Sequence, residues 1–158
     1  MITGADIVDR LSQVIRRTTL LTVLTAGTGF PVLNRSVNTF VFTEPSVILA
    51  ISMSSWVSLQ NSGFTLALGV GMDNGPTITV QDSCLFGVHT YGSTVTTVVG
   101  SAQTQDTILN FSYPFFPRAD ASQSLAGYAS PATAVNENAA LISTIYYAPL
   151  SFIRNLRL

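Results

Sequence analysis

The stretch FTLALGV, residues 64–70, places large apolar side chains at every second position, with small or hydroxyl residues between them. The stretch TITVQ, residues 77–81, does the same, and this period of two is typical of a strand with one buried face. Between the two runs, Asp73-Asn74-Gly75 combines residues that favour tight turns, so the pattern predicts a hairpin there. Residues 47–51, VILAI, are apolar at every position and predict a central strand that is covered on both faces.

Further short runs with strand character continue the pattern along most of the chain. They are residues 37–43, 56–60, 84–91, 94–99, 107–113 and 141–147. Short strands at close spacing with turn residues between them predict an all-β fold, an antiparallel β-sandwich of the jelly-roll kind. The sequence thus predicts a β-sandwich domain over residues 31–158.

An N-terminal helix is expected before the sandwich, over Thr3–Leu24, with residues 1–30 forming a helix and linker. Apolar residues recur there at 4-3-4-3 spacing, which is the pattern of a short coiled-coil seam. The seam residues are Ile7, Leu11, Val14, Thr18 and Leu21. Two interpretations are open: a seam between subunits, or an amphipathic helix that packs on its own domain.

Residues 114–140 interrupt the strand rhythm. The segment contains Pro114, Pro117 and Pro131, many Ala and Ser residues, and only three charged residues. Its length exceeds that of a passive connection, which favours a functional segment. We expect an arm over a neighbouring subunit or a binding loop, and the third alternative is a short strand hidden in the segment.

Charge is scarce and unevenly distributed. Only 9% of the 158 residues are charged, the net charge is −1, and all seven basic residues are arginine. Four arginines lie within the first 35 residues and two within the last five, while residues 36–153 carry one arginine and six acids. The two ends are therefore basic and the body acidic, which suggests different partners for the ends and the body.

Several classes of function are disfavoured. One Cys and one His provide neither a disulfide framework nor a metal cluster. The sequence has no basic patch interleaved with aromatic residues, so nucleic-acid binding is disfavoured. It also has no apolar stretch long enough to span a membrane. The N-terminus lacks the pattern of a signal peptide, so we expect synthesis in a cytoplasm.

Catalysis is also disfavoured. Cys84 and His89 are an odd number of residues apart in one strand and face opposite ways, which excludes a Cys–His nucleophile pair. We expect Cys84 to be a small buried residue and His89 an ordinary surface or interface histidine. The acids show no convergent spacing, so we expect a non-enzymatic protein without a cofactor.

Aromatic residues mark a candidate binding or interface surface. Trp56 alternates with Ser58 and falls on the polar face of its strand, and an aromatic cluster begins the 114–140 segment. An indole among hydroxyl and amide groups suits a sugar-stacking platform or a subunit interface. The candidate residues are Trp56, Tyr113, Phe115 and Phe116. A receptor- or carbohydrate-binding module is therefore the alternative function.

Low charge and Thr/Ser-covered sheets suit a surface that copies of the same chain cover, so we expect an obligate homo-oligomer, a trimer. With its helix, its 37–99 sheet region and its basic ends, the chain resembles small virion structural proteins of tailed bacteriophages, namely trimeric capsid decoration (cement) proteins and jelly-roll fibre heads. The resemblance implies a homotrimer in the virion that docks on the major capsid protein or another virion scaffold. The implied docking residues are Arg10, Arg16, Arg17, Arg154 and Arg157.

Overall fold

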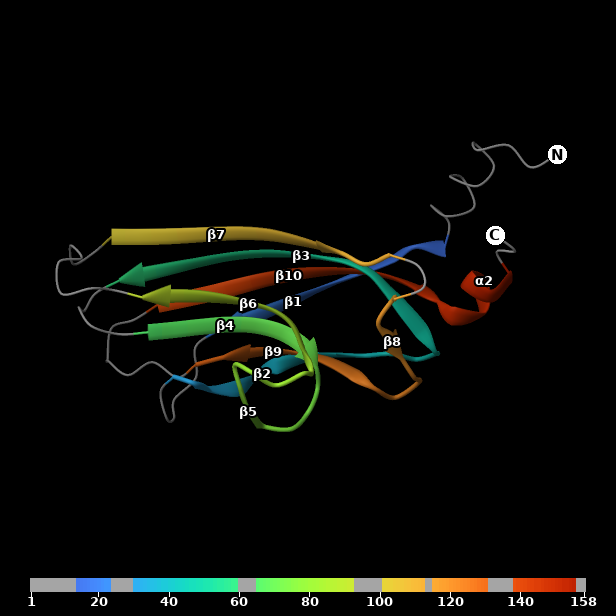
Figure 1. Cartoon of the computed structure of the whole chain (residues 1–158), viewed down its shortest axis with the longest axis horizontal. Helices are drawn as coiled ribbons and strands as arrows, with labels where there is room; N and C mark the ends of the chain where they lie inside the picture. Colours follow the sequence, from blue (N-terminus) through green and yellow to red (C-terminus); the bar gives the residue numbers. More distant parts are fainter. Residues whose placement is uncertain are drawn as a thin grey trace.

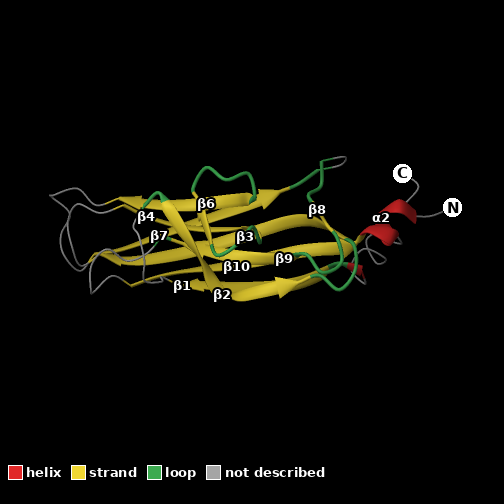
Figure 2. Ribbon diagram, turned by 90° about the horizontal axis from the view of Figure 1, so that it is seen from below, coloured by secondary structure: helices red, strands yellow, loops and turns green. Residues whose placement is uncertain are grey.

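The computed structural model describes residues 14–23, 30–59, 65–92, 101–112, 115–130 and 138–155. These residues form two layers of antiparallel strands, which we call sheet A and sheet B (Figure 1). The strands run along the long axis of the molecule, and a short helix lies at one end (Figure 2). The all-β fold that the sequence predicts is confirmed.

Each sheet is five-stranded. Sheet A contains, in spatial order, β1 (Arg16–Val23), β10 (Asn138–Pro149), β3 (Ser46–Leu59) and β7 (Ser101–Asn110), with β8 (Arg118–Ala119) beside β3. Sheet B contains β5 (Thr77–Thr79), β2 (Val32–Val41), β9 (Ser124–Ala129), β4 (Thr65–Met72) and β6 (Leu85–Gly92). Helix α2 (Leu150–Asn155) follows β10 directly.

The long strands pair as nested ribbons. Strand β1 pairs with β10, β2 with β9, β3 with β7, and β4 with β6, all antiparallel. Pairing of β10 with β3 and of β9 with β4 joins these ribbons into the two sheets. A chain that folds back on itself in this order and wraps into two packed sheets has jelly-roll topology.

The main core lies between the sheets. Alternate residues of β3, such as Ile51 and Met53, are at most 1% exposed, and they pack against Leu66, Leu68 and Val70 of the sheet B strand β4. The stretches that alternate in the sequence therefore supply this core, because every second side chain of a strand points to the same face. Val47 and Ile48 are buried as well, whereas Leu49 and Ala50 are half-buried, so the prediction of a strand covered on both faces is met only in part.

The N-terminal helix is not seen where it can be tested. Residues 16–23 form β1, whose pairing with β10 runs from Arg16 opposite Tyr147 to Val23 opposite Ala140. Its sequence, RRTTLLTV, is rich in β-branched residues, which favour strands, and the partner strand decides between the two periods. Strand β1 is thus part of the sandwich rather than of a separate unit that ends at residue 30. Residues 1–13 and 24–29 lie outside the described residues.

The turn Asp73-Asn74-Gly75 exists, with Gly75 at φ +103°, but the hairpin prediction is wrong. Strand β5 pairs with β2 at the far edge of sheet B, whereas β4 pairs with β6 and β9. The turn therefore leads the chain across the outer face of sheet B instead of back along β4.

The segment 114–140 contains β8 and β9, so the hidden-strand alternative is the correct one. Strand β9, of sequence SLAGYA, lies in the middle of sheet B and is buried on both faces from Leu125 to Ala129. Its Gly127 faces Thr22 of β1, and a β-carbon at position 127 would collide with the Thr22 hydroxyl. Glycine is required here because the two sheets approach each other closely.

Candidate self-association surface

The outward-pointing residues of sheet A form one continuous surface, which we call the A face. The register of the four long strands places them in four cross-strand rows. The rows are Val23, Ala140, Trp56 and Thr104; Leu21, Ile142, Ser54 and Asp106; Thr19, Thr144, Ser52 and Ile108; and Arg17, Tyr146, Ala50 and Asn110.

Large apolar side chains on the A face are open to solvent. Ile108 is 68% exposed, Ile142 47%, and Leu21 and Trp56 44% each. Val23 and Tyr146 are also exposed. No element in the described part of the chain packs over these residues. Water therefore contacts a sheet face on which half of the positions in the four rows are apolar and most of these apolar side chains are large.

Only two of the sixteen positions are charged. Arg17 lies on the edge strand β1 and Asp106 on the opposite edge strand β7, so the middle of the face carries no charge. The cores of protein interfaces are likewise depleted of charged residues and enriched in aromatic ones. The A face follows this pattern, with Trp56 on the inner strand β3 in an end row and the charges on the edge strands.

The size of the A face is also that of an interface core. Four strands about 4.8 Å apart and seven residues of about 3.3 Å each cover roughly 450 Å². Each partner buries about 800 Å² in a standard specific interface, and contiguous apolar patches of several hundred Å² mark interaction sites. A partner that covers the A face would therefore bury the central part of a stable interface.

The outer face of sheet B is different because the chain covers it. Strand β5 and the residues after it bury a second apolar cluster on this face, and Cys84, Leu85 and Val88 pack against it. The cluster consists of Leu33, Ala67, Ile78, Ala126 and Tyr128. Cys84 thus packs on the outer side of sheet B.

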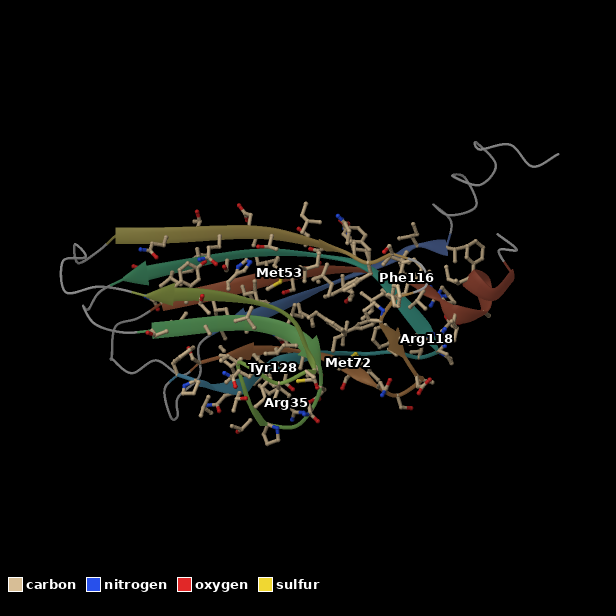
Figure 3. All side chains as sticks on the ribbon, in the orientation of Figure 1. Arg35, Met53, Met72, Phe116, Arg118 and Tyr128 are labelled. Carbon is tan, nitrogen blue, oxygen red and sulfur yellow. The ribbon has the colours of Figure 1, made fainter. Side chains whose placement is uncertain are left out.

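A polar network holds this cover in place. Asp73 accepts a hydrogen bond from Arg35 at 2.7 Å and one from Ser124 at 3.2 Å, and the Tyr128 hydroxyl accepts the Asn74 N–H at 2.9 Å. Figure 3 labels Arg35 and Tyr128 on this side of the molecule. Burial would raise the pKa of Asp73, but the Gly75 N–H and the Arg35 guanidinium hold that pKa below its ordinary value.

The seam residues do not form a seam. Thr18 and Leu21 are an odd number of positions apart in β1, so they face opposite sides of sheet A, and only Leu21 belongs to the A face. Val14 precedes this strand and is half-buried. Ile7 and Leu11 lie outside the described residues. The helical period predicts Thr18 and Leu21 on one face of a helix, whereas the strand places them on opposite faces of the sheet.

The predicted docking arginines gather near one end of the molecule, as far as they are described. Arg16 forms a 2.5 Å ion pair with Glu44, and Arg17 lies on the A face. Because the start of β1 pairs with the end of β10, both lie near α2, which contains Arg154 (Figure 1). The side chain of Arg154 and all of Arg10 and Arg157 lie outside the described parts.

The predicted aromatic residues are not brought together. Trp56 lies in the A face, as its alternation with Ser58 predicts, whereas Phe115 and Phe116 lie in the segment before β8. Phe115 is 81% exposed and Phe116 is half-buried. Tyr113 lies outside the described residues. The sequence interpretation missed Ile108 and Ile142, because each stands next to a leucine, Leu109 or Leu141, so that alternation does not show which of the two points outward.

His89 is buried between the sheets, so the prediction of a surface or interface histidine is wrong. Its side chain is hydrogen-bonded to Ser55 of β3 and Thr107 of β7, residues that are distant in the sequence. Ser55 and His89 are 3% and 4% exposed, which leaves a substrate no access to this Ser–His pair. Among the described residues, no group of three or more His, Cys, Asp or Glu side chains could hold a metal ion.

No protein-family model matches the chain, and no curated protein matches it. It is similar to several solved structures at low identity. Three of these are Eiger TNF from S. frugiperda (9% identity, TM-score 0.43, 87% of this chain and 93% of that chain), the decameric BFDV capsid protein (10%, 0.29, 85% and 94%) and infectious bursal disease virus, Gx strain (13%, 0.17, 90% and 44%). The jelly-roll assignment rests on the strand order, since TM-scores this low do not establish a shared fold. No helix in the described ranges is long and apolar enough to cross a membrane.

Proposed function

We propose that this chain is a non-enzymatic structural protein that self-associates through the A face. In its specific form, the proposal is a homotrimer that decorates and stabilises a viral capsid in the virion and contacts the major capsid protein or another virion scaffold. The observation that carries the self-association is the A face itself, an uncovered apolar sheet surface with its two charges at the rim.

A second copy is the occupant that the composition favours. The A face offers few charges for electrostatic recognition of a differently charged partner, and its Thr, Ser and apolar side chains are self-complementary. A soluble chain with 9% charged residues gains by covering such a surface with copies of itself. Covering the A face would leave the α2 end of each subunit available for another partner.

The scaffold contact would use that end. Arg16, Arg17 and Arg118 lie at the α2 end, and Arg16 is paired with Glu44. Arg17, Arg118 and the arginines of the C-terminal sequence therefore supply the remaining positive charge. An acidic patch on a capsid would attract this end with a strength that falls as salt rises. This contact is distinct from the subunit contact and has its own test.

Ile142→Lys tests the self-association. Ile142 lies in the middle of the A face, and a lysine there would place a charge in the centre of the interface. We expect the wild type to sediment as a trimer and the variant as a folded monomer in analytical ultracentrifugation. Val37→Lys is the matched control, because Val37 is 89% exposed on β2 in the other sheet and should leave the trimer intact.

Electron microscopy of the wild type separates decoration from shell building. Discrete trimers support a decoration protein, whereas closed shells formed by the chain alone would replace decoration with a shell-forming role.

For the scaffold contact, Arg154→Ser should weaken binding to purified capsids of the virus in a salt-dependent manner. Arg118 of β8 lies at the same end as α2, because β8 pairs with the start of β3 beside the end of β10, so Arg35→Ser on β2, away from this end, serves as the control (Figure 3). Unchanged binding by the Arg154 variant would exclude this docking end.

A second candidate function is saccharide binding at Trp56. The indole is 44% exposed between Ser54 and Ser58 on the surface of sheet A, which is the environment of a sugar-stacking platform. A glycan array with the wild type and Trp56→Ala would test this function. Glycan binding that the substitution removes, from a chain that sediments as a monomer, would replace the structural proposal.

A further inference from the structure

A buried polar network joins the two sheets along one side of the sandwich. Strand β6 is an edge strand of sheet B and β7 is an edge strand of sheet A, so no backbone ladder connects them. Instead, Ser55 Oγ lies 2.5 Å from both His89 Nδ1 and the Tyr91 hydroxyl, and His89 Nε2 lies 2.9 Å from Thr107 Oγ1. Ser55, His89 and Tyr91 are at most 4% exposed.

A further bond closes the same side. The Gln105 side-chain amide of β7 donates to the Thr90 carbonyl of β6 at 3.0 Å. Side chains of β6 and β7 thus replace the backbone pairing that two strands of one sheet would have. His89 lies in the middle of this connection.

The protons of the network have one consistent arrangement. The Tyr91 hydroxyl donates to Ser55 Oγ, which in turn donates to His89 Nδ1, because the reverse direction would leave the Tyr91 proton without an acceptor among the described residues. His89 must then carry its single proton on Nε2 and donate it to Thr107 Oγ1. Every buried polar group of this hydrogen-bond network has a partner only while the imidazole is neutral.

We propose that Ser55, His89, Tyr91 and Thr107 form a proton-sensitive latch that holds β6 against β7 when His89 is neutral and releases this side of the sandwich when His89 is protonated. The ligand is the proton itself. The released state would expose the inner face of β7 and the free edges of both strands to solvent or to another chain. The proposal does not depend on the function of the A face.

Protonation opposes the latch for two physical reasons. A proton on Nδ1 turns the acceptor of the Ser55 hydrogen bond into a donor, so Ser55 would have to donate to Tyr91, and the Tyr91 proton would lose its buried acceptor. The new charge is also buried between the sheets, where no carboxylate of the described residues is hydrogen-bonded to the imidazole. The lost hydrogen bond and the buried charge both destabilise only the folded state in which the latch is closed.

The surroundings of His89 leave this balance in favour of the neutral form. Burial lowers the pKa of His89 below its ordinary value, and Asp106 of β7, the charged group that acts on it, opposes this shift only in part. Burial likewise raises the pKa of Tyr91, which stays neutral throughout. Ser55 of β3, Leu68 of β4 and Thr107 of β7 add no charge. The stability that the latch supplies is therefore complete above the unfolded-state pKa near 6.5 and is lost as the pH falls towards the lower folded-state pKa.

Hydrogen exchange and NMR of the full chain test the latch. His89 is the only histidine in the sequence, so its imidazole signal titrates without overlap once any histidine tag has been removed. We expect opening-limited exchange of β6 and β7 amides to rise about ten-fold between about pH 7.5 and pH 5, after correction for intrinsic rates. The amides of β1 and β2, on the opposite side of the sandwich, are the internal control.

His89→Gln is the matched variant. The Gln carbonyl accepts from Ser55 and its amide donates to Thr107, so the variant keeps the neutral hydrogen-bond pattern but cannot titrate. We expect its β6 and β7 exchange to change less than about two-fold over the same range. Equal pH dependence in both proteins would overturn the latch, as would a wild-type imidazole that titrates at its ordinary pKa. The wild-type titration decides alone if the variant does not fold.

Discussion

The outer faces of the two sheets both carry apolar residues but differ in whether the chain itself covers them. Sheet B carries apolar residues on its outer face, and the chain covers them with β5 and the turn at Asp73–Gly75. Sheet A also carries apolar residues on its outer face, but no described element covers Leu21, Ile108 or Ile142. The outer face of sheet B is thus covered within the subunit, whereas the A face is left open in the described residues, and our proposal is that a partner covers it.

The largest expected difference between the two faces comes from matched leucine-to-lysine substitutions. Leu33 of sheet B is 0% exposed beneath its cover, so Leu33→Lys should cost about 4 kcal/mol or more and prevent stable folding. Leu21 on the A face is 44% exposed, so Leu21→Lys should fold normally but fail to self-associate. Circular dichroism and sedimentation of both variants provide the comparison. Equal loss of fold in both would show that the A face is covered by its own chain.

Asp73→Asn should loosen the cover of sheet B by a moderate amount. It removes the charged partner of Arg35 and weakens the bonds from Gly75 and Ser124, for an expected loss of about 1–2 kcal/mol in the free energy of unfolding at neutral pH. Because the folded-state pKa of Asp73 is depressed, its contribution is present above the unfolded-state pKa of about 3.9 and is lost as the pH falls through the lower folded value. Denaturant titrations of both proteins should therefore converge below about pH 4. The association state should not change, since Asp73 is not in the A face.

Tyr128→Phe should have the smallest effect of the three. The hydroxyl accepts the Asn74 N–H and lies within 3.4 Å of Asp73, while the ring stays buried at 0% exposure in the second cluster. Removing the hydroxyl alone should cost about 1 kcal/mol and leave the cluster packed. Chemical denaturation measures this loss. A loss as large as that of Leu33→Lys would mean that the hydroxyl, rather than apolar packing, holds the cover.

The sequence predicted the core strands well because burial and alternation coincide there. Leu66, Leu68 and Val70 point inward at a period of two, and the consecutive residues Val47 and Ile48 are both buried, as their composition indicates. Strand β7 is less regular: it is an edge strand exposed on both faces, so polar residues occupy both of its sides and no alternation results. Strand β9 consists largely of small residues because the sheets approach closely at Gly127, and small residues carry little strand signal.

The candidate site was predicted in part. Trp56 falls on the exposed face that its neighbours Ser54 and Ser58 indicate, but Leu21 was assigned to a helix because its spacing fits both periods. The environment of His89 depends on Ser55 and Thr107, which lie 34 and 18 residues away in the sequence. Local sequence patterns contain no information on such long-range neighbours, so the burial of His89 could be found only from the structure.

Acrylamide quenching of Trp56 tests the central claim most directly, because this residue is the only tryptophan and lies in the A face. If copies of the chain cover the A face, the indole should be shielded at concentrations where light scattering reports a trimer. Its quenching constant should then rise about three-fold on dilution to monomers, as expected for a side chain that moves from a buried interface to water. The Ile142→Lys variant should show the high value at all concentrations. A Trp56 that is fully accessible to acrylamide in the associated protein, or a chain that stays monomeric at every concentration, would contradict the account.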